Sequence, residues 1–401
     1  MNEYSELSLK LTKNLNKDVK KKQGIYFTPP KTINVMIRLL KQYINNNNKL
    51  QILEPSCGSC EYILKLSKEF DKSNITGIEY NNDIYNSILH YKSNSITLLN
   101  EDFMKSTHEK KYDLIVGNPP YFTMKKKEVC KSYYRYFKGK PNIFILFIIK
   151  CLHLLNDDGI LGFVLPKSFL NTLNYGRTRE YIYRNFQILD IMECRGEYIE
   201  TKQKTIIFIV KKTPNIENDL YTMRINDMIL FNTKNNIGNL KKLHSGSVTL
   251  SSLGFKVTIG TVVWNQCKDI LTSDSTKTRL IYSGDVNNGM LKYKTYKNPC
   301  KQNFINKNGD SDKILILSRG YGIGNYNLDY AIVDVDYPYL VENHLMRVIY
   351  DGYISESDLD SLYNKIIKSL SCEKTKKFID ICFGNNAINT TEIMNIVPIY
   401  L

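Results

Sequence analysis

The sequence contains an apolar run that ends in Asn-Pro-Pro-Tyr. Residues 113–117 read Asp-Leu-Ile-Val-Gly, typical of a buried strand, and Asn118, Pro119, Pro120 and Tyr121 follow directly. An amine conjugated to an aromatic ring is a poor nucleophile, so two acceptors aimed at its N–H bonds would favour attack on a methyl sulfonium. The Asn118 side-chain carbonyl and the Pro119 backbone carbonyl are candidate acceptors that two prolines would hold in place. Tyr121 offers a flat face for a base lifted from its stack. The alternative is an ordinary strand end with a Pro-Pro turn.

Three further acidic residues stand at the ends of predicted strands. Glu54 opens the turn Glu54-Pro55-Ser56-Cys57-Gly58, whose small residues let backbone approach a ligand and whose carboxylate suits an ammonium group. Glu79 ends the next strand, where an acid can accept both hydroxyls of a ribose. Asp102 follows the third strand and could accept from an adenine amine while Phe103 packs on the ring. The alternative for Glu54 is a generic strand-to-helix turn in which Cys57 and Cys60 are small packing residues, and for Glu79 and Asp102 it is a solvated acid at a strand end. The ordered set favours a shared ligand.

Strands and helices alternate along the region that carries these residues. Strands are predicted at 51–53, 75–79, 96–99, 113–116, 160–165, 188–192 and 205–210, and helices near 60–70, 82–91, 142–155 and 175–185. This alternation predicts a parallel sheet covered on both faces, which binds ligands beyond the carboxyl ends of its strands. Apolar residues at helical spacing predict another helix over 33–44.

The composition is that of a globular protein with a basic surface. The chain has 401 residues, 42% of them hydrophobic, and a formal net charge of +15. That charge is compatible with binding to a polyanion, and equally with a lysine-rich surface that needs no partner. An odd number of cysteines, nine, favours reduced thiols, and the single CxxC lacks the second pair that a zinc ribbon needs. No apolar run is long enough for a membrane span, and the polar start excludes a signal peptide.

Together these motifs resemble the γ-class (Taq-type) DNA adenine-N6 methyltransferases of restriction-modification systems over roughly residues 20 to 212. The resemblance implies S-adenosyl-L-methionine as cofactor, with no metal. It implies cofactor contacts from residues before and after the first three strands and at the Asn-Pro-Pro-Tyr loop: Tyr26, Thr28, Glu54, Pro55, Ser56, Gly58, Glu79, Asp102, Phe103 and Asn118. It implies catalytic roles for Asn118, Pro119, Pro120 and Tyr121, and stacking of the flipped base by Tyr121 and Tyr198.

The implied fold is α/β: a Rossmann-like, mostly parallel seven-stranded methyltransferase sheet with a C-terminal mixed α/β recognition domain. We expect a polar arm or helix over 1–22, the methyltransferase domain over 23–214, a linker over 215–250, and a DNA target-recognition domain with C-terminal helices over 251–401. Within that last domain, residues 314–322, 341–345 and 383–399 resemble recognition elements of the same enzymes, and 356–382 reads as helical.

The implied activity is sequence-specific methylation of a flipped-out adenine in duplex DNA, in a bacterial cytosol or the DNA-containing compartment of a viral infection. A restriction nuclease, where one exists, would be a separate chain, because about 20 residues before the first motif are too few for a nuclease domain. Two alternatives stay open. One is methylation of a different amine, such as cytosine N4, an RNA base or a protein glutamine. The other is a catalytically silent nucleic-acid-binding subunit.

Overall fold

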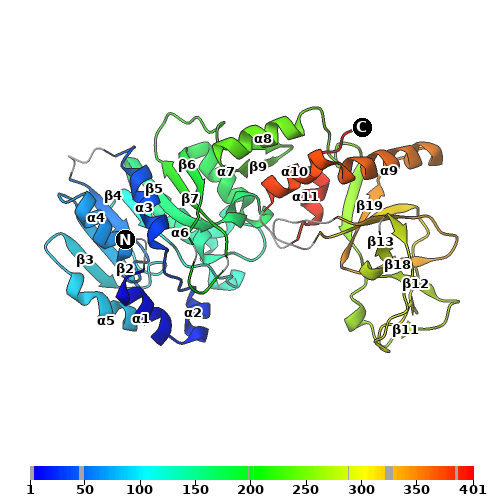
Figure 1. Ribbon diagram of the computed structural model, residues 1–401, viewed down its shortest axis with the longest axis horizontal. Helices are drawn as coiled ribbons and strands as arrows, with labels where there is room; N and C mark the ends of the chain where they lie inside the picture. Colours follow the sequence, from blue (N-terminus) through cyan, green and yellow to red (C-terminus); the bar gives the residue numbers. More distant parts are fainter. Residues whose placement is uncertain are drawn as a thin grey trace. The chain divides into compact units, whose positions relative to one another are not determined.

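The computed structural model describes residues 4–44, 49–196, 198–201, 203–287, 289–320, 328–383 and 387–401. The chain forms two compact units, whose elements are shown in Figure 1. Unit 1 comprises Met1–Met223 with Ile229–Ile237, and unit 2 comprises Arg224–Met228 with Gly238–Leu401. In the described part of the chain, every helix is too short or too polar to cross a lipid bilayer.

Unit 1 is built on a seven-stranded mixed sheet in the order β3-β2-β1-β4-β5-β7-β6. Its strands are β1 (Gln51–Glu54), β2 (Asn74–Glu79), β3 (Ile96–Asn100), β4 (Tyr112–Gly117), β5 (Leu155–Pro166), β6 (Gln187–Glu193) and β7 (Thr205–Lys211). Strand β7 runs antiparallel to β5 and β6, whereas the pairs from β3 to β5 are parallel. Each of the seven predicted strands overlaps an observed one. The strand order reverses direction between β1 and β4, the position at which such sheets bind ligands.

Helices cover both faces of this sheet because its strands are apolar on both sides. Along β4, Leu114 and Val116 pack in one core and Ile115 packs in the other. The first core contains residues of α3 (Pro30–Leu40) and α4 (Glu61–Glu69), with Ile88 at the end of α5 (Asn82–Ile88); the second contains residues of α6 (Ile143–His153) and α7 (Gly176–Asn185). The continuous apolar strands therefore have the burial expected of a sheet with two covered faces.

The N-terminal segment, predicted as an arm or a helix, forms two helices, α1 (Glu6–Asn14) and α2 (Lys17–Gln23). The Ser5 side chain caps α1 by accepting from the backbone N–H of Ser8. Helix α2 ends at Gly24, which adopts a left-handed conformation with φ of +65°. Glycine adopts this conformation without steric cost, so the helix can stop there and the chain can turn into the next segment.

The segment 215–250, which we expect to be a linker, has regular secondary structure. This segment contains the hairpin strands β8 (Thr222–Ile225) and β9 (Met228–Phe231) and the helix α8 (Lys234–His244). The strands are only four residues long and flank a turn at Asn226, whose φ is +50°. Their apolar residues are buried, but Asn and Asp residues interrupt them so often that the segment reads as polar.

Unit 2 contains two four-stranded sheets. One has the order β10-β19-β16-β17 and the other the order β11-β15-β12-β18. The first consists of β10 (Phe255–Ile259), β16 (Ile314–Ser318), β17 (Tyr330–Val333) and β19 (Leu345–Tyr350), and the second of β11 (Leu271–Thr272), β12 (Thr278–Ile281), β15 (Phe304–Ile305) and β18 (Tyr339–Val341). A two-stranded pair, β13 (Val286–Asn287) with β14 (Met290–Leu291), accompanies them.

Three helices follow these strands: α9 (Glu356–Ser371), α10 (Glu373–Cys382) and α11 (Thr390–Asn395). The predicted helical tail is interrupted at Cys372, whose extended backbone ends α9 and whose side chain caps α10. Parts of the segments that resemble recognition elements, residues 321–322 and 384–386, lie outside the described residues.

Candidate active site

A cavity of about 600 Å³ opens at the carboxyl ends of strands β1, β2, β3 and β4 in unit 1. It brings together residues that lie far apart in the sequence, from Lys22 to Phe147. Nine residues predicted to form the site line it: Tyr26, Pro55, Ser56, Gly58, Glu79, Asp102, Phe103, Asn118 and Pro120. The loops that follow these parallel strands thus meet at one edge of the sheet, as the sequence predicted.

Asn118 follows the last residue of β4 and is held from both sides. Its Nδ2 donates to the Tyr26 carbonyl at 3.2 Å, and its backbone carbonyl accepts from the Ser56 hydroxyl at 3.3 Å. Because a carbonyl can only accept, the contact with Tyr26 places the amide nitrogen on that side and leaves Oδ1 for a donor. That donor is the Tyr121 hydroxyl, at 2.5 Å. Asn118 therefore presents a fixed acceptor beside the cavity.

Gly24 allows the N-terminal segment to pack directly on the Asn-Pro-Pro-Tyr loop. A Cβ at Gly24 would lie 2.8 Å from the Tyr121 backbone nitrogen and 3.1 Å from the Pro120 Cβ. Both contacts are too close, and one is with backbone that cannot move aside. The Tyr26 carbonyl reaches Asn118 because no side chain separates the two segments here.

Glu79 ends β2 and is almost fully buried. Its Oε2 accepts from the Gly58 backbone N–H at 2.9 Å, and its Oε1 accepts from the Asn81 N–H at 2.7 Å. Burial raises the pKa of this carboxyl group to about 7, against the lowering effect of these backbone hydrogen bonds. The carboxylate is therefore oriented by the loop after β1 and titrates near neutral pH.

Glu54 ends β1 and lies in a smaller hollow of about 40 Å³ that Thr28, Ser56, Gly58 and Asn118 also line. Its side chain is 2% exposed, and its Oε2 atom has no hydrogen-bond partner among the described residues. Burial, and then the proximity of Cys60 and Glu79, raise the pKa of this carboxyl group well above its ordinary value. A buried acceptor without a donor is costly, and a cationic donor would compensate for it.

Asp102 and Phe103 follow β3 on the other side of the cavity. Asp102 Oδ1 accepts from the Met104 N–H at 3.1 Å, and Lys105 Nζ lies 3.3 Å from Oδ2. Phe103 is 2% exposed, and its ring lies 5.1 Å from the ring of Phe147 and under Lys150 Nζ at 4.5 Å. The pair thus combines a partly exposed carboxylate with an immobile aromatic wall.

Tyr121, Pro119 and Tyr198 were predicted to act at the site, but they line neither hollow. The Tyr121 ring packs edge-on against Phe144 at 5.9 Å, and its hydroxyl lies 2.7 Å from the Val164 carbonyl as well as near Asn118. Tyr198 approaches both Tyr121 and Asn118, and its hydroxyl is buried without a hydrogen-bond partner among the described residues. Burial raises the pKa of both phenols, so both remain protonated.

Several residues of the site were not predicted from the sequence. The cavity is also lined by residues before Tyr26 and by a segment after Tyr121: Lys22, Gln23, Gly24, Phe122, Met124, Val129 and Tyr133. Tyr62 is buried, and the phenol of Tyr198 contributes to raising its pKa. Phe122 directly follows the Asn-Pro-Pro-Tyr loop in the sequence, so its place in the cavity could have been predicted. The position of Tyr62 depends on long-range packing and could not.

The donor and acceptor set fits a ligand with ribose hydroxyls, an amine and a positive charge. Two buried carboxylates, Glu54 and Glu79, and the partly exposed Asp102 face the hollows, and Phe103 forms an apolar wall. The unpartnered Glu54 Oε2 is the clearest sign, because the folded chain supplies no donor to it among the described residues.

Comparison with known proteins agrees with this chemistry. Residues 3–199 match the family described as Eco57I restriction-modification methylase. Modification methylase CviBIII of Paramecium bursaria Chlorella virus NC1A is 26% identical over 99% of both chains, and Type II methyltransferase M.CvrRI of Paramecium bursaria Chlorella virus XZ-6E is 25% identical over 99% of both chains. A solved structure of a putative class I S-adenosylmethionine-dependent methyltransferase from Listeria monocytogenes aligns with a TM-score of 0.45 and 18% identity, over 52% of this chain and 67% of that one.

The protein is a methyltransferase of the type found in restriction-modification systems, and its cofactor is S-adenosylmethionine. The matched region includes every residue of the site described above, from Lys22 to Tyr198. Over residues 3–199, just under half of its length, the chain therefore matches the family described as Eco57I restriction-modification methylase.

Proposed function

We propose that this protein is a sequence-specific DNA adenine-N6 methyltransferase that acts on a flipped-out adenine. The observation that carries the proposal is the placement of Asn118. Asn118 follows the end of β4, and the Tyr26 carbonyl orients its amide group. Asn118 also lines the same cavity as Glu79 and Asp102. An acceptor suited to an aromatic amine thus adjoins acceptors suited to the nucleoside part of the cofactor.

The cofactor residues follow the order of the strands. Glu54, in the hollow with Thr28, accepts from the ammonium group, and Tyr26, Pro55, Ser56 and Gly58 enclose the methionine part. Glu79 accepts from the ribose hydroxyls. Asp102 accepts from the adenine amine, and Phe103 packs on the ring. When bound, S-adenosylmethionine supplies an electrophilic methyl group on a positively charged sulfur.

Two acceptors then hold the target amine. The Asn118 Oδ1 atom and the Pro119 carbonyl accept hydrogen bonds from the two N–H groups of this amine. They thereby favour a tetrahedral geometry at the amine nitrogen, which attacks the methyl carbon of the cofactor. The Tyr121 hydroxyl has a single proton and can donate either to Asn118 Oδ1 at 2.5 Å or to the Val164 carbonyl at 2.7 Å. Rotation of this proton toward Val164 frees Asn118 without the loss of a hydrogen bond.

Tyr121 and Tyr198 are proposed to stack on the two faces of the flipped base. Both side chains are partly buried, and their hydroxyl groups approach one another. Entry of a base therefore requires the two rings to separate. Aromatic faces are suited to this contact because a base that leaves the duplex loses its stacking partners.

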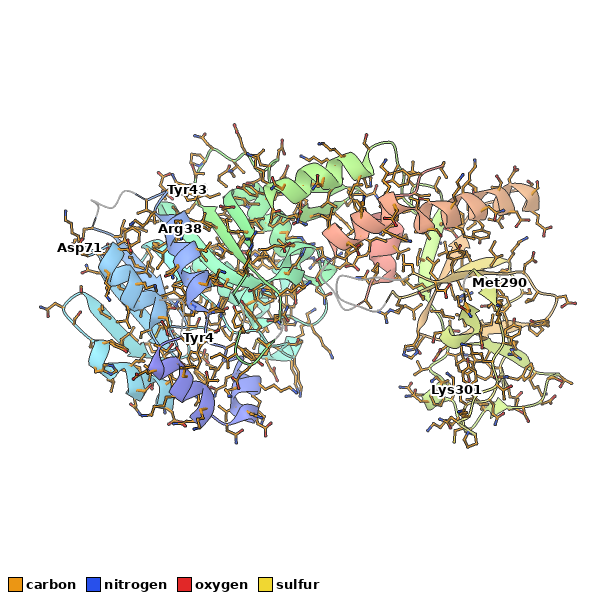
Figure 2. All side chains as sticks on the ribbon, in the orientation of Figure 1. Tyr4, Arg38, Tyr43, Asp71, Met290 and Lys301 are labelled. Atoms are coloured by element: carbon orange, nitrogen blue, oxygen red, sulfur yellow. The ribbon has the colours of Figure 1, made fainter. Side chains whose placement is uncertain are left out.

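Duplex DNA is the proposed partner of this enzyme. Residues 251–401 are proposed to recognise the DNA site, and residues 23–214 to form the catalytic domain. Unit 2 has clusters of cations on aromatic rings. Lys301, labelled in Figure 2, lies 4.0 Å from the Tyr296 ring and 4.2 Å from the Tyr282 ring. Tyr293 and Tyr337 are each more than one third exposed, and their hydroxyl groups form a hydrogen bond of 2.8 Å. Such combinations of cations and rings suit phosphate contact and base stacking.

The test is to express the wild type, Asn118→Ala and a control, Asn94→Ala, in a host and to sequence a plasmid with modification-sensitive reads. Asn94 is exposed and lies before β3, at the opposite edge of the sheet from the cavity. We expect one motif methylated on adenine by the wild type and the control, and none by Asn118→Ala. Modified cytosine, or modified RNA beside unmodified DNA, would contradict the proposed substrate.

A further inference from the structure

A strongly basic segment follows Tyr121 directly, and none of the roles above uses it. Residues 122–140, here named the basic rim segment, contain six lysines and one arginine against one glutamate, a net charge of +6. The whole chain carries +15, so about one twentieth of the residues holds more than a third of the net charge. The segment includes two 3-10 turns, Lys126–Glu128 and Lys131–Tyr136.

The segment forms one wall of the cavity. Phe122, Met124, Glu128, Val129, Cys130 and Tyr133 line the same cavity as Asn118 and Glu79. A base that reaches Asn118 must therefore enter within a few side chains of this segment. Because the base stays attached to its sugar and phosphates, the adjoining DNA backbone must then lie at the mouth of the cavity.

The backbone of the basic rim segment is anchored. At its ends, Met124 N–H donates to the Pro141 carbonyl at 2.9 Å, and Ile143 N–H donates to the Phe122 carbonyl at 3.0 Å. In its middle, the Thr178 hydroxyl donates to the Tyr136 carbonyl at 2.7 Å. Val129 and Phe137 are buried against Leu146 of α6. The inward side of the segment is thus apolar and attached to the core.

The outward side is cationic, and the structure shows no carboxylate paired with it among the described residues. Its seven basic side chains are exposed, and within the described residues no carboxylate lies within 4 Å of their charged nitrogens; they are Lys125, Lys126, Lys127, Lys131, Arg135, Lys138 and Lys140. The one acid, Glu128, accepts from the backbone N–H of Lys125 at 3.0 Å. Two of the cations lie over rings, Lys126 over Tyr134 at 4.7 Å and Arg135 over Tyr136 at 4.8 Å.

Like charges held close on an anchored backbone repel one another, and a polyanion relieves that repulsion. We infer that the basic rim segment binds the phosphodiester backbone of duplex DNA beside the target nucleotide. This inference rests on the proposed function and adds to it a second DNA-binding surface, within the catalytic unit itself. The contact is with phosphates and so carries no sequence information.

The test compares two triple variants with equal loss of charge. In the first, Lys125, Lys126 and Lys127 are replaced by glutamine. In the control, Lys49, Lys68 and Lys72 are replaced by glutamine. All three are exposed: Lys49 precedes β1, Lys68 lies in the last turn of α4, and Lys72 follows Asp71, which is labelled in Figure 2, and precedes β2. Binding of a fluorescent 30-base-pair duplex of random sequence is measured from 0.05 to 0.3 M salt.

We expect the rim variant to bind this duplex roughly 10- to 100-fold more weakly at 0.1 M salt, and the slope of log affinity against log salt to fall by about 2 to 3. The control should change affinity by less than about 3-fold, since a distant charge contributes only a screened field. Equal losses in both variants, or an unchanged salt slope in the rim variant, would overturn the inference. So would tighter wild-type binding to a double-stranded RNA of the same length.

Two further measurements keep the result interpretable. Calorimetry should give the same affinity for S-adenosylmethionine in the rim variant and in the wild type. If the rim variant does not fold, it is replaced by a double variant, Lys131→Gln with Lys140→Gln, which should weaken duplex binding about 10-fold. A wild type that leaves plasmid adenine unmodified refutes the proposed function. A wild type that methylates adenine, with a rim variant that binds DNA normally, refutes only the role of the segment.

Discussion

The two halves of the site differ in what their polar atoms face. In the cofactor half, Glu54 and Glu79 face the hollows, and Glu54 Oε2 has no partner among the described residues. In the acceptor half, the polar atoms face one another: the Tyr121 hydroxyl lies on Asn118 Oδ1, and Tyr198 approaches both. The carboxylates of the cofactor half are thus accessible to a ligand, whereas the polar atoms of the acceptor half are occupied by neighbouring side chains.

This difference indicates an order of events. A ligand can enter the cofactor half without displacing a protein hydrogen bond at Glu54. A base can reach Asn118 only after the Tyr121 hydroxyl has turned away and the two tyrosine rings have separated. If the acceptor half receives a DNA base as proposed, conformational change is therefore confined to that half, and DNA must supply the free energy for it.

The strongest test of this independence is Asn118→Ala. Loss of one preorganised acceptor should lower kcat by roughly 100- to 1,000-fold, because the amine is no longer held in its reactive geometry. Since Asn118 belongs to the acceptor half in this comparison, cofactor affinity should change much less. Steady-state kinetics with calorimetry separates the two quantities. A parallel collapse of cofactor binding would show that the halves are coupled through Asn118.

The converse test is Glu54→Gln. The variant keeps the shape of the side chain but loses the charge that an ammonium group would meet, so the Kd for S-adenosylmethionine should rise roughly 10- to 100-fold. The matched control is Glu69→Gln, because Glu69 is exposed and its carboxylate pairs with Lys41 at 2.5 Å. A change of Kd in the control as large as in Glu54→Gln would indicate a general electrostatic effect instead.

The placement of the acids in the cofactor half at one edge of the sheet could be predicted because local patterns encode it. The strands that lead to Glu54, Glu79 and Asp102 are short apolar runs, and parallel strands bring their carboxyl ends to one edge whatever the details of packing. The turn after β1 also requires glycine at residue 58, because the backbone there has a φ of +50°. Each of these features depends on residues within a few positions of the acid itself.

The acceptor half was predicted only in part, because long-range packing determines it. The sequence places Tyr121 three residues after Asn118, but not the contact of its hydroxyl with Val164, 43 positions away. Close to Tyr198 in the sequence, Glu200 likewise forms a partly buried ion pair at 2.5 Å with Lys20, which is 180 positions away. No local pattern reports such partners.

A further test uses the titration of Glu79, whose carboxyl group has its pKa raised by burial to about 7. Ribose hydroxyls donate to the ionised form, so protonation below pH 7 competes with the cofactor. The Kd should rise about 10-fold between pH 8 and pH 6 in the wild type and much less in Glu79→Gln. Without ligand the sign is opposite: the folded state holds the proton more tightly, so stability falls as the pH rises through 7. Calorimetry and thermal melts at each pH test both trends.

The smallest expected effect comes from Tyr121→Phe, which tests whether the acceptor half is closed by a hydrogen bond or by packing. The variant keeps the ring for stacking but removes the donor that occupies Asn118 Oδ1. Because Tyr121 can move its proton to the Val164 carbonyl, the competition is weak, and we expect KM for DNA to fall only about 2- to 5-fold with kcat unchanged. Tyr121→Ala, which also removes the ring, should instead raise KM. A large loss of kcat in Tyr121→Phe would mean that the hydroxyl takes part in the reaction, because stacking and the acceptor at Asn118 are both retained in that variant.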